Sequence, residues 1–299
     1  MKIETKIAKF KLLTPIVCAS GTVGFGQELI GLCDFSSIGA ITTKTITLNS
    51  REGNPPPRIY ESGEGVLNSV GLENPGLEGF IEEKLPKLKN LKTKCIVSVG
   101  GFSINEYKTI VKALGSKKDV HALEINLSCP NLQLKKLISQ DEKATYQITK
   151  SLRKLTKKPL IIKITPEVTD IVKIAKMVEK AGADAIAMVN TFFSMAINIE
   201  TQKPFLGNGY GGYSGRAIKP MSLYRVWRVA QNVKIPIIGG GGIETASDAI
   251  EFILAGATAV SLGTINLVNP NSAQSVLKGI KNYMKRKKIT GIEAIRGAI

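Results

Sequence analysis

The chain has 299 residues, 43% of them hydrophobic and 22% charged, so it can bury a large core and is too apolar to be disordered. It shows no signal peptide and no apolar run of membrane-spanning length, which predicts a cytoplasmic protein without a membrane partner. The four cysteines, Cys18, Cys33, Cys95 and Cys129, lack the spacing of metal ligands. We therefore expect reduced thiols and no metal site.

The chain is strongly basic, with 41 Lys and Arg against 24 Asp and Glu and a net charge of +17. Its basic runs, such as residues 150–158 and 284–288, resemble the solvated faces of helices. Aromatic residues make up only 6% of the chain and do not alternate with these runs as base-stacking platforms would. The sequence therefore favours anionic small molecules as partners over nucleic acid. A non-enzymatic nucleic-acid binder is the alternative.

Short apolar runs alternate with longer amphipathic segments along the whole chain. The amphipathic periodicity is clearest over residues 171–178 and 246–254. Continuous apolar strands joined by helices indicate a parallel sheet covered by helices. Eight such units predict a single α/β domain over residues 1–299, a (β/α)8 barrel, with a doubly wound sheet as the alternative. The predicted strands are Pro15–Cys18, Ile38–Thr43, Cys95–Val99, the run from Ala122 to Leu127, Pro159–Ile162, Ala185–Val189, Ile235–Ile238 and Ala259–Leu262.

Polar residues follow the ends of these strands, and two long excursions, 45–75 and 192–218, leave from the same ends. In a barrel these ends meet at one mouth, which is where barrel enzymes place their sites. Gly241, Gly242 and Gly263 would let a phosphate approach bare backbone N–H groups. The polar residues expected at the mouth are Ser20, Lys44, Ser98, Asn126, Cys129, Lys163, Asn190 and Thr264.

Carboxamides indicate the kind of substrate, because an amide side chain matches a ring edge that presents both C=O and N–H. Asn68, Asn126, Asn131 and Asn190 could grip a reduced pyrimidine, although each could instead be a turn residue.

The one histidine, His121, falls at the far end of its strand, which favours a structural role and leaves Cys129 as the natural proton acceptor. Lys163 has two interpretations: a Schiff-base lysine of an aldolase, or a cation held against a flavin ring.

Two motifs are more specific than any glycine cluster: Asn126-Leu-Ser-Cys-Pro-Asn131, and Asn68-x-x-Gly-Leu-x-Asn-Pro-Gly76. With them, nearly the whole chain resembles the dihydroorotate dehydrogenases, flavin enzymes of de novo pyrimidine (UMP) biosynthesis. The resemblance implies oxidation of (S)-dihydroorotate to orotate with FMN as hydride acceptor. It makes Cys129 the base that takes the proton from C5 while the C6 hydride passes to N5 of FMN.

The resemblance also implies binding roles, position by position. The implied FMN-binding residues are Ser20, Lys44, Thr45, Asn126, Lys163, Val189, Gly215, Gly241, Gly242, Gly263 and Thr264. The implied substrate-binding residues are Lys44, Asn68, Ser69, Val70, Gly71, Leu72, Asn126, Asn190 and Thr191.

The branch of the family can be argued as well. A cysteine base and a start shortly before the first strand resemble the soluble class 1 enzymes, and Asn54-Pro-Pro-Pro-Arg58 resembles the NAD-linked type 1B. That type implies a homodimer joined by an FAD and 2Fe-2S electron-transfer subunit into a heterotetramer. The fumarate-dependent type, or an enzyme acting on another dihydropyrimidine, is the alternative. Two features depart from the pattern. Ser98 stands where an asparagine is expected near the flavin, so that contact would be lost or bridged by water. The loop after Asn131 lacks the glycines usual in the NAD-linked type, which leaves the electron acceptor open.

Overall fold

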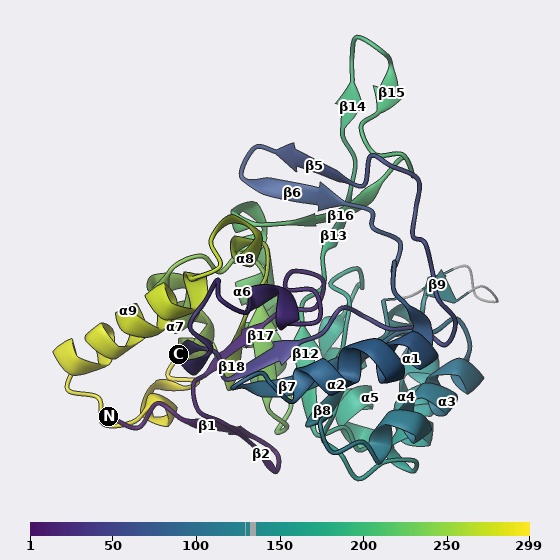
Figure 1. Cartoon of the computed structure of the whole chain (residues 1–299). Helices are drawn as coiled ribbons and strands as arrows, with labels where there is room; N and C mark the ends of the chain where they lie inside the picture. Colours follow the sequence, from purple (N-terminus) through teal and green to yellow (C-terminus); the bar gives the residue numbers. More distant parts are fainter. Residues whose placement is uncertain (129, 132–135) are drawn as a thin grey trace.

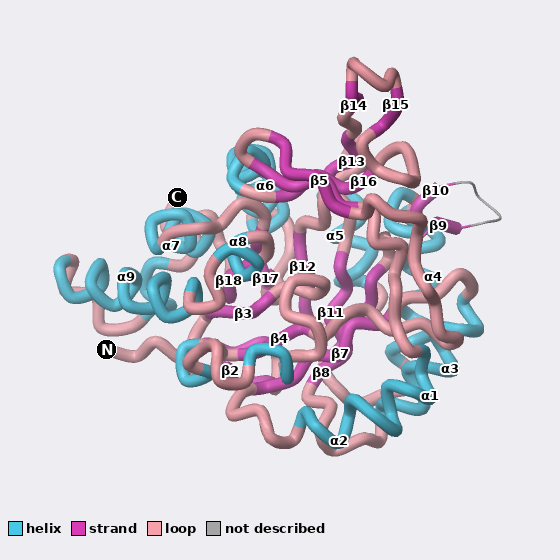
Figure 2. The backbone as a smooth tube through the Cα atoms, turned by 45° about the horizontal axis from the view of Figure 1, so that its top comes forward, coloured by secondary structure: helices cyan, strands magenta, loops and turns pink. Residues whose placement is uncertain are grey.

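The computed structural model describes residues 1–128, 130–131 and 136–299, with the backbone alone for residues 130, 131 and 136. Eight parallel strands close into a barrel in the order β11-β12-β17-β18-β3-β4-β7-β8 (Figures 1 and 2). All eight predicted strands are confirmed, and the doubly wound alternative is wrong because the sheet has no open edge. The strands are β3 Ile16–Cys18, β4 Ala40–Thr42, β7 Lys94–Val99, β8 Ala122–Asn126, β11 Leu160–Lys163, β12 Ala185–Met188, β17 Ile237–Gly240 and β18 Ala259–Leu262.

Helices surround the barrel and bury its outer face, which is why the strands read as continuous apolar runs (Figure 2). Ser103, Asp141, Asp170 and Thr245 each accept a backbone N–H at the start of a helix, which stabilises that end. The helices are α1 Gly76–Gly79, α2 Leu85–Leu88, α3 Ile104–Gly115, α4 Glu142–Arg153, α5 Ile171–Lys180, α6 Lys219–Ala230, α7 Ala246–Leu254, α8 Ile265–Val268 and α9 Ser272–Arg286. One π-helical turn, Phe80–Lys84, joins α1 to α2, and α5 and α7 occupy the two segments predicted from periodicity.

The amino-terminal hairpin lies against the end of the barrel that is opposite the mouth. Its strands β1 Thr5–Ile7 and β2 Phe10–Leu12 contribute Ile7, Phe10 and Leu12 to the same buried cluster as the inward-facing side chains of the barrel strands. The barrel interior is therefore closed by apolar packing at this end, and only the carboxyl ends of the strands are open to a ligand.

The two long excursions combine into one sheet above the mouth. Strands β5 Ile59–Ser62 and β6 Gly65–Asn68 come from the first, and β13 Phe192–Ser194 and β16 Gly211–Ser214 from the second, in the order β13-β16-β6-β5 (Figure 1). We call this sheet the roof. A smaller ladder, β14 Ile197–Asn198 with β15 Lys203–Pro204, projects beyond it as an arm. Another short ladder pairs β9 Pro130–Asn131 with β10 Lys136–Leu137 beside the mouth.

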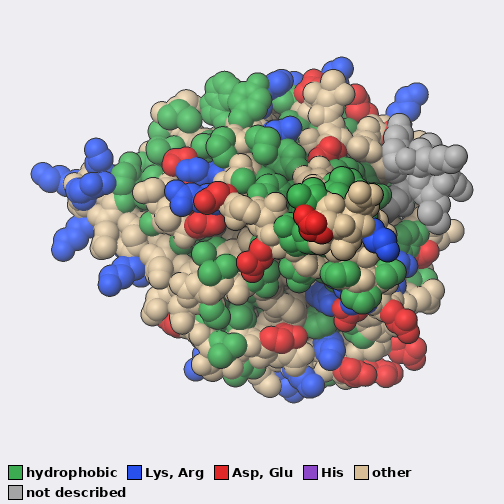
Figure 3. Space-filling model, turned by 90° about the horizontal axis from the view of Figure 1, so that it is seen from above, with side chains coloured by type: hydrophobic (Ala, Val, Ile, Leu, Met, Phe, Trp, Pro, Cys, Tyr) green, Lys and Arg blue, Asp and Glu red, His purple; other side chains and the backbone are tan. Residues whose placement is uncertain are grey.

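Seen from above, hydrophobic side chains gather over the roof and arm, whereas a dense group of Lys and Arg side chains lies at the edge where α9 ends (Figure 3). Ile197 and Ile199 of the arm are 55% and 80% exposed. Within the described part of the chain, no helix is long and apolar enough to cross a membrane.

Candidate active site

A cavity of about 600 Å³ lies between the carboxyl ends of the barrel strands and the roof. This volume falls in the range of small-molecule and cofactor sites. The cavity is lined by every residue to which the family resemblance gives a binding role, although the roles themselves remain predictions: Ser20, Lys44, Thr45, Asn68, Ser69, Val70, Gly71, Leu72, Asn126, Lys163, Val189, Asn190, Thr191, Gly215, Gly241, Gly242, Gly263 and Thr264. Ser98, also expected at the mouth, is fully buried and does not line the cavity. The side chain of Asn131, a further candidate for the pyrimidine, lies outside the described part of the chain. Cys129, the predicted base, lies outside the described residues.

One side of the cavity offers a cradle of backbone N–H groups, just beyond β17 and β18. Among the hydrogen bonds between described residues, none is donated by the backbone N–H of Gly241, Gly242, Gly263 or Thr264. Gly241 and Gly242 have φ of +118° and +81°, which an L side chain rarely adopts. A Cβ at Gly263 would have only that of Ala19, at 4.0 Å, as a neighbour. Such a cluster of unpaired N–H groups beside open space fits a phosphate.

Carboxamides face the cavity from three directions, and each uses only part of its hydrogen-bonding capacity inside the protein. The Asn68 amide nitrogen donates to the backbone oxygen of Gly212 at 3.2 Å, across the roof. The Asn126 side-chain oxygen accepts from the backbone of Ser128 at 3.1 Å, and that of Asn190 accepts from Thr191 at 2.9 Å. The other half of each amide is therefore available to a ligand that presents both donors and acceptors.

The roof requires glycine where it touches the barrel. A Cβ at Gly212, opposite Asn68 in the β6–β16 ladder, would come within 2.0 Å of the Thr191 hydroxyl. This close approach holds the amide of Asn68 above the end of β12.

Two cations, Lys44 and Lys163, line the described part of the cavity, one near the roof and one inside the barrel. Lys163 faces a buried acid, Glu124, which is 5% exposed and borders the same cavity. Burial raises the pKa of the Glu124 carboxyl, while the charge of Lys163 and a hydrogen bond from Ser98 oppose that rise. One carboxyl oxygen, Oε1, has no hydrogen-bond partner among the described residues.

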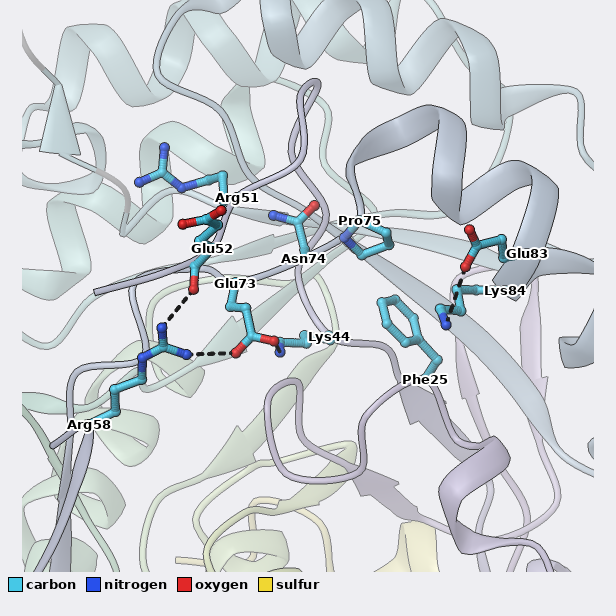
Figure 4. A pocket seen from close by; sticks show the side chains of 10 residues that line it. All are labelled: Phe25, Lys44, Arg51, Glu52, Arg58, Glu73, Asn74, Pro75, Glu83 and Lys84. Atoms are coloured by element: carbon cyan, nitrogen blue, oxygen red, sulfur yellow. Dashed lines mark hydrogen bonds and ion pairs between the residues drawn. The ribbon is translucent and has the colours of Figure 1, made fainter. Parts of the chain in front are cut away.

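A second pocket adjoins the cavity and shares Lys44 with it (Figure 4). Here Glu73 lies between two cations: one carboxylate oxygen is 3.6 Å from the Lys44 ammonium and the other 2.9 Å from the Arg58 guanidinium. Arg58 also donates to the backbone oxygen of Glu52 at 2.7 Å. The Arg58–Glu73 ion pair therefore links the Asn54–Arg58 motif to the Asn68–Gly76 motif. The Lys44–Glu73 ion pair of the same cluster positions Lys44.

Asn74 shows the structural role of an asparagine that the motif contains. Its side-chain oxygen accepts from the backbone N–H of Thr47 and Gly76, and its nitrogen donates to the hydroxyl of Thr47 and the backbone oxygen of Leu72. Both halves of this amide are occupied, so Asn74 shapes the loop that carries the predicted substrate-binding residues.

The described thiols and the histidine lie away from the mouth or are poorly reactive. Burial raises the pKa of Cys18 and Cys95 to about 12. The His121 ring accepts the backbone N–H of Cys95 at 3.2 Å and lies 6.3 Å from the ring of Phe10, at the closed end of the barrel. The predicted position of His121, at the end of its strand away from the mouth, is confirmed.

Sequence reasoning gave no role to several residues that the structure brings to the cavity. Ser214 accepts the Thr264 hydroxyl at 2.9 Å and Tyr210 borders the cavity from the second excursion. Glu124 also borders the cavity. Its signal was present, since a charged residue in an otherwise apolar strand must either face a site or find a partner.

A closed (β/α)8 barrel with a polar cavity at the carboxyl ends of its strands has the architecture of a barrel enzyme. The family model for dihydroorotate dehydrogenase matches residues 2–284. The chain belongs to the dihydroorotate dehydrogenase family, and is an oxidoreductase. Membership removes the aldolase alternative for Lys163.

Curated relatives agree over their full length. The dihydroorotate dehydrogenase B (NAD(+)) catalytic subunit of Caldicellulosiruptor saccharolyticus is 47% identical over 100% of this chain and 99% of its own. Those of Alkaliphilus metalliredigens and Geotalea uraniireducens are 45% and 43% identical with similar coverage. A crystal structure of the Eimeria tenella enzyme with ferulenol covers 99% of this chain and 88% of its own at a TM-score of 0.81, with 24% identity, and supports the fold. The predicted family and its NAD-linked branch are confirmed.

Proposed function

We propose that this chain oxidises (S)-dihydroorotate to orotate with FMN as hydride acceptor, in pyrimidine biosynthesis. The observation that carries the proposal is the meeting, in one cavity, of three half-satisfied carboxamides, two cations and a cradle of unpaired backbone N–H groups. A flavin mononucleotide needs an anion site and a polar floor, and a dihydropyrimidine carboxylate needs amides and a cation. The cavity offers both sets.

The residues present fit FMN. The N–H groups of Gly241, Gly242, Gly263 and Thr264 would hold the phosphate, near the start of α7, whose positive end favours an anion. Ser20, Thr45, Lys163, Val189 and Gly215 would border the ring and ribityl chain, as would Lys44 and Asn126. The chemistry that FMN supplies when bound is acceptance of a hydride.

The chain's own residues would hold the substrate and remove its proton. Asn68, Asn126 and Asn190 would bind the amide groups of the pyrimidine ring, and the loop from Ser69 to Leu72 with Thr191 would enclose it. Lys44 would bind the carboxylate. Cys129 would take the proton from C5, because the described histidine is at the other end of the barrel.

We propose two kinds of protein partner, an electron-transfer subunit and a second copy of this chain. The word "subunit" in the names of the relatives supports a second polypeptide, and we infer one that carries FAD and a 2Fe-2S cluster and passes electrons to NAD. Exposed apolar side chains on the roof and arm, among them Phe193, Met195 and Ile199, support an association surface, as expected for a homodimer within a heterotetramer. A cytoplasmic location remains a prediction from the sequence. Light scattering of the chain alone would give a dimer mass if the homodimer is right, and a monomer mass if it is wrong.

An anaerobic titration tests the proposed function directly. The FMN-loaded chain is titrated with dihydroorotate while the visible absorbance of the flavin is followed. Stoichiometric bleaching that is lost in Cys129→Ala, with FMN still bound, supports substrate, cofactor and base together. A spectrum that dihydroorotate leaves unchanged would contradict the substrate, and dihydrouracil would be titrated next.

An acceptor assay tests the proposed electron route to NAD through a second subunit. Turnover of the chain alone with fumarate as electron acceptor would contradict that route.

A further inference from the structure

A continuous belt of polar side chains crosses the inside of the barrel below the mouth. We call Ser20, Thr45, Ser98, Glu124 and Lys163 the polar belt. They come from five neighbouring strands or strand ends, in the barrel order β3, β4, β7, β8 and β11. The hydroxyl of Thr45 lies 3.2 Å from that of Ser20 and 2.8 Å from that of Ser98. Ser98 lies level with Glu124 in the pairing of β7 with β8, and the charge of Lys163 acts to lower the pKa of the Glu124 carboxyl.

Glu124, the acidic residue of the polar belt, is buried where the desolvation of a carboxylate is unfavourable. Glu124 is 5% exposed, and in the strand pairing it lies level with Ile161, below Asn126 and Lys163. The interior around it is apolar, since Ile161 at its level and Ile96 below it belong to one buried cluster. A buried carboxylate in such a place needs an opposite charge.

Lys163 is the cation that can supply that charge. It pairs in register with Asn126, two residues along β8 from Glu124, so both side chains point to the barrel interior. Lys163 forms no ion pair shorter than 4.0 Å within the described chain, and Oε1 of Glu124 has no partner there. The two groups therefore interact across a gap and both border the cavity.

We propose that Glu124 is a positioning residue: lying level with Ser98, it is the counter-charge of Lys163 at the cavity floor and sets the relative affinity of the site for oxidised and reduced flavin. This inference rests on the flavin site of the proposed function. It gives Ser98, which departs from the family pattern, a role as the neighbour of Glu124 in the polar belt, with its hydroxyl 2.8 Å from that of Thr45.

The sign of the effect follows from the charges. With both groups ionised, the floor carries no net charge beneath the ring. Glu124→Gln keeps the size of the side chain and leaves the ammonium unbalanced, which favours the more electron-rich reduced flavin. In a Lys163→Met background the buried carboxyl would take up a proton, since burial disfavours its charged form. In the Lys163→Met background, Glu124→Gln therefore replaces one neutral group by another and should change the relative affinity for the two flavin states very little.

A double-mutant cycle tests the pairing. Wild type, Glu124→Gln, Lys163→Met and the double variant are compared by the Kd of the apo chain for oxidised FMN and by the midpoint potential of the bound flavin. We expect Glu124→Gln alone to shift the ratio of the two affinities at least tenfold toward reduced flavin, which is about 30 mV for a two-electron couple. In the Lys163→Met background the same change should shift the ratio less than twofold.

Two further variants keep the test decisive. Ser98→Ala should shift the ratio in the same direction by a smaller factor, and it remains informative if Glu124→Gln folds poorly. Thr149→Val is the matched control, because the hydroxyl of Thr149 is also buried without a partner among the described residues but lies on α4, away from the cavity. It should leave both Kd and potential unchanged.

Each outcome decides one claim. An unchanged potential in Glu124→Gln, with lowered thermal stability only, would make Glu124 a structural residue and overturn the inference. Equal shifts in both backgrounds would overturn the pairing with Lys163. Wild type that binds FMN but is not bleached by dihydroorotate would contradict the proposed substrate alone, because affinity and potential need no substrate. Wild type that binds no FMN would overturn both.

Discussion

The Lys44 ammonium and the Glu73 carboxylate lie 3.6 Å apart at the border between the cavity and the second pocket (Figure 4). Lys44 follows β4, whereas Glu73 belongs to the motif that carries the predicted substrate loop. Through the other oxygen of Glu73, Arg58 joins the same cluster. The cation that we expect to bind the substrate carboxylate is therefore held by the loop that would enclose the substrate.

Removing this cation should weaken carboxylate binding. Hydrogen bonds to charged groups contribute about 1.5–3 kcal/mol, so Lys44→Met should raise the Kd for orotate by about tenfold or more. The measurement is the orotate-induced change in the flavin spectrum. Uracil, which has the ring but no carboxylate, is the control ligand, and its weaker binding should change little. An equal loss for both ligands would contradict the assignment of Lys44 to the carboxylate.

Neutralising Glu73 should have the opposite and smaller effect. Its side chain is 45% exposed, and such ion pairs contribute at most about 1 kcal/mol. Glu73→Gln frees the Lys44 ammonium for the ligand, so orotate should bind up to about fivefold more tightly in the same titration. Weaker binding would show instead that Glu73 is needed to position Lys44.

Gly263 tests the phosphate cradle without disturbing the fold. An alanine here has space in the apo chain, since the nearest neighbour of the new Cβ is 4.0 Å away, but the methyl group would enter the space beside the cradle. We expect Gly263→Ala to change the free energy of unfolding by no more than about 0.5 kcal/mol and to weaken FMN binding by about tenfold or more. Fluorescence quenching of FMN measures the affinity, and urea unfolding the stability.

Gly291→Ala is the matched control for this substitution. It also has space, with its nearest contacts at 3.7 Å, and it lies in the bridge to Lys2, outside the cavity. FMN affinity should equal that of wild type. If Gly263→Ala binds FMN as tightly as this control, the phosphate does not lie against Gly263.

The barrel was predictable because its signals are local. Each strand is a continuous apolar run and each intervening helix has its own periodicity and caps, so the strand ends could be named from order alone. The polar residues that follow them could be named in the same way, whereas Ser69–Leu72, Val189, Thr191 and Gly215 came only from the family resemblance. Ser20 and Thr264 are 244 residues apart, and no motif links them. They were predicted to lie at one mouth because each follows the carboxyl end of a predicted strand, and both line the cavity.

The roof could not be predicted in this way. Its strands are short, carry glycine and lack alternation, as in Gly211–Ser214, and β16 pairs with β6 from the other excursion. Which side chains lie next to each other inside the barrel could not be predicted for a related reason. That Glu124 lies level with Ser98 depends on the register of β7 against β8, which no single strand specifies.

The Lys219 ion pair predicts a broad pH plateau of stability. The Lys219 ammonium lies 2.6 Å from Asp248, which also accepts the backbone N–H of Thr245 at the start of α7. The hydrogen bond to Asp248 raises the pKa of Lys219, so its stabilisation is complete below the ordinary lysine value and is lost as pH rises through the folded pKa. Burial opposes ionisation of Asp248, but hydrogen bonds from Lys219 and Thr245 lower its pKa, so its share is lost only in acid.

Lys219→Met should therefore lower the free energy of unfolding by about 1–3 kcal/mol at every pH between about 5 and 9. Urea unfolding across this range measures the difference. A deficit that appears only at one end of the range would show that a different group titrates there.

The single histidine of the chain should make the folded state less stable in mild acid. Burial, followed by the charges of Lys94 and Lys158, lowers the pKa of His121, whose ring accepts the backbone N–H of Cys95. With the folded pKa below the unfolded one, the unfolded chain binds the proton first as pH falls below about 6.5, and the folded state loses stability from there down to the folded pKa.

A NMR titration of the ring protons should give a midpoint below about 6.5. His121→Gln keeps a hydrogen-bond acceptor and removes the titration, so the stability gap between wild type and this variant should move in the variant's favour from pH 7 to pH 5. A gap that stays constant over this range, together with an ordinary midpoint, would mean that the ring is solvated and does not close the barrel end with Phe10.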